Sequence, residues 1–463
     1  MRHPTTWVGP ALPILLMLSA LGIGGCSGDT MSEPGAELAG ARTSTDPTVT
    51  STLPNSTSRD TTLDVQVIGT GFDLGSQAEF ARNGTVDPKL RVNSTRYVKS
   101  TQLTVNVTVA VDAEVARYDV YVTTSKGKKG IGTEMFAVNP ILALPLAQGG
   151  EARDVNDAGL VVGQEGAAPN PTRPFAWSEE MGVRYLPVSP GSCFLTAGAV
   201  NNQGIILARN GCESNSWSRW LPDGSGNWTA EPLGFAPDGR LPEAQAINDV
   251  GLIVGSSVDP STNIMYPYAW TEGQGWTPLQ VPAAEPSCTI DVVNDLGTMV
   301  GGCQASGSSQ ISTYLWSSPS AAPVRLSLPM PSGHVKFGVT GINDAGILVG
   351  WSITCNCSRQ IQRALRWTPS GTSYSLTDLG DLGGGEAKAT AINDAGQIVG
   401  KSATASKVPH AFLYTPGAGM RDLGALGSQD SWALALNSGT GAPLTIVGWS
   451  MANSGHRAVR WVP

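Results

Sequence analysis

The sequence predicts an all-β protein, a seven-bladed β-propeller preceded by an immunoglobulin-like β-sandwich. Three observations predict this fold class. The 463 residues include 56 Gly and 32 Pro, and only 14% are charged, a composition typical of many turns and few long helices. The hairpin-like stretch "AINDAGQIVGKS", residues 391–402, recurs in close variants along the C-terminal part of the chain. Residues 60–138 alternate apolar and polar side chains between Gly and Asn turns, the pattern of half-buried strands.

The N-terminal residues 1–25 form a predicted export signal. Arg2 precedes an apolar stretch from Ala11 to Ile23, which is shorter than the span of about 20 residues that crosses a bilayer. The following "IGGC" resembles the bacterial lipobox, in which the cysteine, here Cys26, becomes the lipidated N-terminus. Because Ser27 rather than Asp follows, the resemblance implies an outer-membrane lipoprotein, anchored to the membrane by its acyl chains and facing the cell surface or the periplasm.

Residues 26–59 are rich in Ser, Thr, Pro and Gly and lack hydrophobic periodicity. Such a segment cannot bury enough apolar surface to form a core. We therefore expect a flexible linker that holds the following domain about 30 Å from the lipid.

Residues 60–138 contain the alternating segments "LDVQVIGTGF", "QLTVNVTVAV" and "RYDVYVTTSKG", which predict a small β-sandwich. "VIGTGFDLGSQAEF" and "YDVYVTTSKGKKGIGTEMFAV" resemble the IPT/TIG branch of immunoglobulin-like domains over nearly all of this segment. The resemblance implies a spacer or protein-binding module without catalytic residues.

Residues 139–463 contain seven copies of one hairpin, about 44 to 50 residues apart. This period is typical of propeller blades. In each Asn-Asp-x-Gly turn, the Asn and Asp side chains bond nearby backbone and Gly accepts positive φ. The key residues are Asn156, Asn201, Asn248, Asn294, Asn343, Asn393 and Asn437.

Two further positions recur in each copy. A small residue ends the second strand, where we expect a larger side chain to crowd a neighbouring strand. An aromatic residue ends the third strand, and its regular recurrence favours core packing over ligand contact. The small residues are Gly163, Ala208, Gly255, Gly301, Gly350, Gly400 and Gly448, and the aromatic residues are Trp177, Trp220, Trp270, Trp316, Trp367, Tyr414 and Trp461.

The ends of the repeat region favour a closed ring over the alternative, a stacked β-solenoid. The last copy stops at "AVRWVP" without a fourth strand, whereas residues 141–146 form an extra strand before the first copy. Pairing of the two would close a propeller and remove the open sheet edge. "AINDAGQIVGKS" and "HAFLYTPGAGMRDLGALG" resemble the HAF family of extracellular bacterial repeats, over residues 150–463, which implies a secreted repeat fold without implying an activity.

Six cysteines remain after Cys26, an even number that suits disulfides in an oxidising compartment. Matching positions in two copies predict the pairs Cys193–Cys212 and Cys288–Cys303. Cys355 and Cys357 could pair with each other, stay free, or form a zinc site with His410 and His456. The spacing is unlike a zinc knuckle, so we expect neither metal nor cofactor.

The net charge of -8 provides no basic surface for nucleic acid, which we do not expect as a partner. No G-x-S-x-G, H-E-x-x-H or P-loop motif is present, so a noncatalytic binding or adhesion scaffold is favoured. The loops opposite the Asn turns vary most among copies and should hold a glycan or protein ligand. The alternative is an enzyme acting on polysaccharide through a pair of channel-mouth carboxylates. The predicted ligand face contains Trp351, Trp432, Trp449, Glu151, Glu243 and Glu386.

Overall fold

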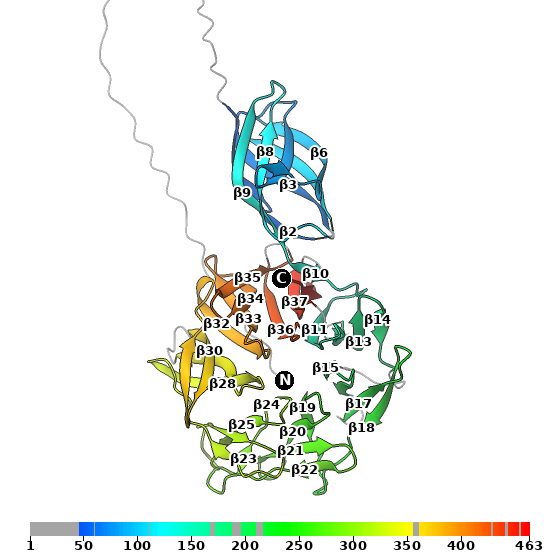
Figure 1. The fold of residues 1–463 in the computed structure, drawn as a ribbon, viewed down its shortest axis with the longest axis vertical. Helices are drawn as coiled ribbons and strands as arrows, with labels where there is room; N and C mark the ends of the chain where they lie inside the picture. Colours follow the sequence, from blue (N-terminus) through cyan, green and yellow to red (C-terminus); the bar gives the residue numbers. More distant parts are fainter. Residues whose placement is uncertain are drawn as a thin grey trace, which may run out of the picture. The chain divides into compact units, whose positions relative to one another are not determined.

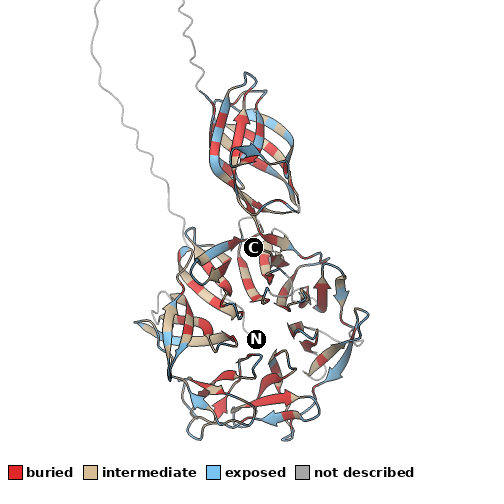
Figure 2. Ribbon diagram, viewed as in Figure 1, coloured by how far each residue is buried: buried red, intermediate tan, exposed pale blue. Residues whose placement is uncertain are grey.

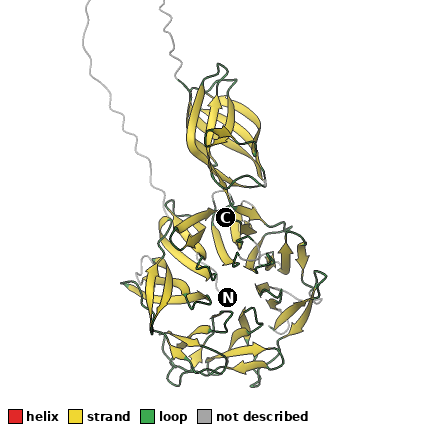
Figure 3. Cartoon of the chain, viewed as in Figure 1, coloured by secondary structure: helices red, strands yellow, loops and turns green. Residues whose placement is uncertain are grey.

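The computed structural model describes residues 46–463, except 60, 111, 167–171, 188–195, 210–215, 355–360, 427–428, 440–442 and 453–454. The regular elements of these residues are strands without any helix (Figure 3), which confirms the all-β prediction. Accordingly, no membrane-spanning helix occurs in this part of the chain. The predicted signal, Cys26, the pair Cys193–Cys212, Cys355 and Cys357 lie outside the described residues.

The N-terminal part is a sandwich of two sheets. Its core is shared by both sheets and includes the fully buried Val65, Val105, Phe80 and Phe136. One sheet has the order β1 (Thr48–Leu53), β3 (Thr61–Thr70), β7 (Gln102–Val109), β6 (Leu90–Lys99). The other has the order β2 (Ser56–Ser58), β9 (Lys129–Asn139), β8 (Arg117–Thr123), β4 (Gln77–Arg82), β5 (Thr85–Val86).

Strands β1 and β2 lie inside the segment predicted to be a flexible linker, so the prediction of a linker as far as residue 59 is wrong. β1 pairs with β3, and β2 pairs in parallel with β9. Val49, Thr52 and Thr57 are buried there. The prediction failed because most buried positions of these edge strands hold Thr, which carries little hydrophobic signal.

The remaining strands form seven sheets of the described chain, numbered 1 to 7, around a common centre (Figure 1). Sheet 1 contains β11 (Gly150–Val155), β12 (Val161–Glu165), β13 (Arg173–Ser178) and β14 (Gly182–Tyr185). Sheet 2 contains β15 (Thr196–Val200), β16 (Ile206–Arg209), β17 (Trp217–Pro222) and β18 (Trp228–Pro232). Sheet 3 contains β19 (Glu243–Ile247), β20 (Ile253–Val258), β21 (Met265–Thr271) and β22 (Gly275–Pro278).

Sheet 4 contains β23 (Ser287–Cys288), β24 (Val292–Val293), β25 (Met299–Gln304), β26 (Ser312–Trp316) and β27 (Val324–Arg325). Sheet 5 contains β28 (His334–Ile342), β29 (Leu348–Thr354), β30 (Gln362–Ser370) and β31 (Ser373–Asp378). Sheet 6 contains β32 (Gly383–Ile392), β33 (Ile398–Thr404), β34 (Pro409–Thr415) and β35 (Gly419–Gly424). Sheet 7 contains β36 (Ser431–Leu436), β37 (Ile446–Ala452), β38 (Gly455–Trp461) and β10 (Ile141–Ala143).

Sheet 7 joins the two ends of the repeat region, as the sequence predicts. β10 pairs antiparallel with β38, with Ile141 opposite Trp461 and Ala143 opposite Val459. The side chains of Ile141, Leu144 and Leu146 are buried. The fourth strand of the last sheet therefore comes from the segment that precedes the first sheet.

Each inner hairpin turns at its repeat Asn. In sheet 6, Asn393 accepts the amide of Gln397 on Oδ1 at 3.0 Å, and the amide of Gly396 bonds the Asn393 carbonyl at 2.9 Å. Gly396 has φ 75°, a conformation that L side chains disfavour. The turn is thus fixed by its own Asn and its Gly.

The Asn side chains also link neighbouring sheets, a role that the sequence analysis did not foresee. Nδ2 of Asn294 donates to the carbonyl of Asn343 at 3.1 Å, and Nδ2 of Asn343 donates to the carbonyl of Asn393 at 3.2 Å. The same bond leaves Asn156, Asn201, Asn248 and Asn393, each toward the next Asn in the chain. Between sheets 7 and 1, the amide of Ser438 donates to Oδ1 of Asp157 at 2.7 Å. We call this series the Asn relay.

The small residue of each repeat lies against the inner strand. A Cβ on Gly400 would overlap the carbonyl oxygen of Lys388, and one on Gly448 would overlap the carbonyl oxygen of Trp432. This crowding confirms the predicted reason for Gly. The repeat aromatics pack in the core as predicted, with Trp316, Trp367 and Trp461 fully buried and Trp220 and Tyr414 partly buried. Figure 2 shows buried residues along the strands of these sheets.

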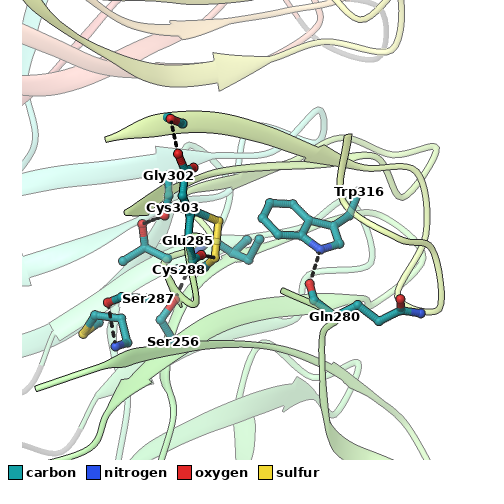
Figure 4. Close-up of a disulfide and its surroundings, with 12 residues drawn as sticks. Ser256, Gln280, Glu285, Ser287, Cys288, Gly302, Cys303 and Trp316 are labelled. Atoms are coloured by element: carbon teal, nitrogen blue, oxygen red, sulfur yellow. Dashed lines mark hydrogen bonds between the residues drawn. A yellow bond between two sulfur atoms is a disulfide. The ribbon is translucent and has the colours of Figure 1, made fainter. Parts of the chain in front are cut away.

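The predicted disulfide between Cys288 and Cys303 is confirmed (Figure 4). The two cysteines lie opposite each other on β23 and β25, and both are fully buried. The bond closes a loop of 15 residues, which in the chain-entropy model stabilises a fold by about 3 kcal/mol.

Candidate binding face

Six of the inner hairpins carry a comparable cross-strand pair on the side away from the Asn turns. In each pair, the second residue directly follows the repeat Gly or Ala, and the first lies opposite it on the inner strand. We call these the rim pairs. They are Glu151 and Gln164, Thr196 and Arg209, Glu243 and Ser256, Gly338 and Trp351, Lys388 and Lys401, and Trp432 and Trp449.

The rim pairs of sheets 5 to 7 bring the three predicted Trp residues into one region. Trp432 and Trp449 are 6.3 Å apart between ring centroids, edge to face. His456 stacks on Trp449 at 4.3 Å with an interplanar angle of 8°. All these side chains are half-buried. The Trp residues lie within β29, β36 and β37 and not in loops as predicted, because the hairpin ladders continue beyond the repeat Gly.

Two lysines connect Trp351 to Trp432. Nζ of Lys401 lies 4.0 Å from the centre of the Trp432 ring. Nζ of Lys388 lies 5.3 Å from the Trp432 ring centre and 5.6 Å from that of Trp351. The faces of indole rings attract such cations. We call the set Trp351, Lys388, Lys401, Trp432, Trp449 and His456 the Trp–Lys patch.

Partial burial affects the pKa of both lysines. It lowers the pKa of Lys388. Burial also lowers the pKa of Lys401, the nearby Lys388 lowers it further, and Asp430 and Glu386 partly offset this decrease. The two ammonium groups therefore repel each other in an incompletely solvated environment.

The structure does not bring the predicted carboxylates together as an acid and base pair. Oε2 of Glu151 forms an ion pair with Nη2 of Arg153 at 3.0 Å, and Oε1 of Glu151 lies 3.7 Å from Nδ1 of His456. Oε1 of Glu243 forms an ion pair with Nη2 of Arg209 at 3.0 Å. Both glutamates thus have basic partners instead of a second carboxylate. Glu386 lies near Lys401. The histidines of the considered zinc site also have other neighbours, since Nδ1 of His410 contacts Asp422 at 2.9 Å.

The opposite face has a polar cavity of about 410 Å³ lined by the Asn-Asp turns. Carboxylate oxygens of Asp295, Asp344 and Asp394 lie within 4.8 Å of one another, and oxygen ligands of this kind suit Ca²⁺ or Mg²⁺. Burial, followed by repulsion from the neighbouring Asp residues, raises the pKa of Asp295. Each carboxylate already accepts a backbone amide from the preceding turn, which makes this ring part of the connection between sheets.

Asp154 should make the free energy of unfolding depend on pH. It accepts the amides of Val155 and Val200, both at 2.9 Å, and so joins sheets 1 and 2. Burial raises its pKa from 3.8 to about 6. The folded state then holds the proton more tightly than the unfolded state, so stability from this group is complete below pH 4 and is lost as pH rises through 6.

We therefore expect Asp154→Asn to remove this pH dependence. Between pH 4 and 7 the wild type should lose up to about 3 kcal/mol of unfolding free energy relative to the variant. Urea denaturation of both proteins across this range measures the difference. Parallel pH profiles for the two proteins would contradict the assignment.

Lys388 and Lys401 are the site residues that the sequence analysis missed. They occupy the same repeat positions as Trp432 and Trp449, since Lys401 follows Gly400 as Trp449 follows Gly448. Aligning the repeats and comparing the side chains at these two equivalent positions would have found them. Glu151 and Glu243 occupy the first position, the one that Lys388 and Trp432 hold, whereas Glu386 does not.

No known family model and no curated protein matches this sequence. Solved structures with a similar fold include virginiamycin B lyase from Staphylococcus aureus, with 13% identity and a TM-score of 0.45, over 70% of this chain and 98% of that chain. A second is the fungal lectin of Aleuria aurantia, described as a six-bladed β-propeller that recognises fucose. It shows 11% identity and a TM-score of 0.36, over 60% of this chain and 95% of that chain. At these identities the likeness concerns the fold alone.

Proposed function

We propose that this protein is a surface lipoprotein whose seven sheets are the blades of a closed β-propeller, and that the propeller is a noncatalytic scaffold that binds glycan. An immunoglobulin-like sandwich of the IPT/TIG type and a lipid anchor at Cys26 complete the proposal. The pairing of β10 with β38 supports ring closure. The two-sheet core of residues 48–139 supports the sandwich assignment.

One observation carries the binding function: half-buried Trp side chains gather on rigid strands of adjacent sheets. Trp432 and Trp449 come from paired strands, and Trp351 joins them through Lys388. The accessible part of each half-buried ring offers a sugar ring apolar contact, while the neighbouring charged groups offer hydrogen bonds. Because the Trp backbones belong to hairpin ladders, little conformational entropy is lost on binding.

Replacing Trp449 with Ala should weaken glycan binding about tenfold or more, equal to about 1.4 kcal/mol. A glycan array probed with the full chain identifies the ligand, and titration calorimetry measures the loss of affinity. Trp449→Phe keeps an aromatic ring and should retain most binding. Phe235→Ala, which removes an aromatic ring that is 70% exposed and does not belong to the Trp–Lys patch, is the control.

Unchanged affinity of Trp449→Ala, with normal folding by circular dichroism, would contradict the proposed face. If the protein bound a protein ligand and no glycan, the ligand would be a protein and not a glycan. Release of reducing sugar ends from a bound polysaccharide would show an enzyme instead of a scaffold.

The anchor is tested by Cys26→Ser, which removes the thiol that receives the lipid. We expect an uncleaved precursor that no longer fractionates with the outer membrane. Mass spectrometry of the N-terminal peptide and membrane fractionation measure both effects. Ser27→Ala is the matched control and should stay lipidated, whereas lipid on the Cys26→Ser protein would refute the anchor.

A further inference from the structure

The Trp–Lys patch holds two cations that form no ion pair with any described residue. Among the described residues, the ammonium group of neither Lys388 nor Lys401 forms an ion pair or donates a hydrogen bond; both groups contact indole rings. Other partly buried cations of the propeller differ. Arg219, Arg240 and Arg363 each contact two carboxylates.

The two ammonium groups share one aromatic neighbour. Both Nζ atoms lie within 5.3 Å of the centre of the Trp432 ring. Lys388 and Lys401 are also directly opposite each other on β32 and β33, so their side chains project from the same face of sheet 6. A single small oxyanion between them can contact both. The ammonium of a lysine has three N–H donors, and an indole face replaces only part of its hydration. An oxyanion placed here would accept these donors and relieve the repulsion between the two charges.

The negative charge of the surroundings restricts favourable contact with an anion to the two lysines. The protein carries a net charge of -8, and Glu386 and Asp430 act on Lys401 from nearby. An anion is therefore not attracted by the molecule as a whole and needs the two lysines for a favourable contact.

We infer that Lys388 and Lys401 form a subsite for a sugar that carries an oxyanion, a carboxylate or a sulfate, while Trp351, Trp432 and Trp449 contact the sugar rings. This inference rests on the proposed glycan-binding function and names the class of glycan, an acidic polysaccharide. Each sugar that contacts the patch presents its charged group to the lysines and its apolar ring face or edge to an indole.

The test compares polysaccharides that differ only in charge. The full chain is titrated in EDTA-containing buffer with polygalacturonate and with its methyl ester, and with dextran sulfate and dextran. We expect an acidic polymer to bind at least tenfold more tightly than its neutral counterpart, with affinity that decreases as salt rises. Binding of polygalacturonate identifies the carboxylate, and binding of dextran sulfate identifies the sulfate.

The double variant Lys388→Gln and Lys401→Gln should lose about tenfold or more in affinity for the acidic polymer only. The control Lys99→Gln and Lys126→Gln removes the same charge from exposed positions of the sandwich and should bind as the wild type does. Lys401→Arg keeps the charge and should retain most binding. Thermal melting verifies that each variant is folded.

Three results would overturn the inference. Equal binding of neutral and acidic polymers, insensitive to the lysines but lost in Trp449→Ala, would leave the proposed function standing and remove the anionic subsite. Equal losses of affinity for the acidic polymer in the double variant and in its sandwich control would show that binding depends on total charge and not on a site at the two lysines. Absence of binding to every glycan would overturn both the inference and the proposed function.

Discussion

Replacing residues 141–146 with a Gly and Ser segment of the same length should lower the free energy of unfolding by roughly 5 to 8 kcal/mol. Three buried side chains, Ile141, Leu144 and Leu146, would be lost, and burying each contributes about 1.5 to 3 kcal/mol. The variant also loses the backbone pairing of β10 with β38. The uncovered edge of β38 should in addition promote association between molecules.

Chemical denaturation and size-exclusion chromatography of the full chain measure these two effects. Ala143→Ser, at an exposed position of the same strand, is the control and should change neither. An unchanged denaturation midpoint in the replaced variant would show that the sheets do not need closure, as expected for an open solenoid.

Asn294→Ala should destabilise the fold by about 3 kcal/mol. The substitution removes the bond from the amide of Thr298 to Oδ1 at 2.8 Å and the bond from Nδ2 to the carbonyl of Asn343 at 3.1 Å. Asn294 is 5% exposed, so the abandoned backbone groups are left without water, and each costs about 1 to 3 kcal/mol.

Asn437→Ala is a matched comparison. Oδ1 of Asn437 accepts the amide of Thr445 at 2.8 Å, but its Nδ2 bonds Pro443 within the same loop at 3.3 Å. A greater loss for Asn294→Ala in thermal or urea denaturation, by about 1 kcal/mol, then measures how much more the bond between sheets contributes than the local bond to Pro443. Equal losses would show that the relay adds nothing beyond the turns.

The architecture could be predicted because particular residue types recur at the positions of each repeat where local packing requires them. Gly400 avoids a collision with the neighbouring strand, Trp367 fills a core, and Cys288 has a partner cysteine at a suitable spacing. Each of these constraints can be recognised from the sequence alone. The Asn relay was not visible, because a side-chain bond to the next sheet depends on how two turns meet in space. The edge strands β1 and β2 were not predicted for another reason: their buried Thr residues give the segment the composition of a polar linker.

The candidate binding face was predicted only in part, for a related reason. Trp432 and Trp449 attracted notice because Trp is rare and large, whereas Lys388 and Lys401 looked like ordinary solvated residues. Their proximity to the Trp432 ring depends on the register of two different sheets. Such contacts depend on how neighbouring sheets pack together and not on any single hairpin.

The direction of the Asn relay has a consequence for the order of folding. Each amide from Asn156 to Asn393 donates to a sheet that follows it in the chain. During synthesis, the last turn to emerge therefore has no acceptor for its buried side-chain amide until the next sheet is formed. The final pairing, Ile141 with Trp461, spans nearly the whole repeat region, and such distant contacts form slowly. We expect incomplete chains to remain open and sensitive to protease, and protection to appear in one late step when the C-terminal strand is released.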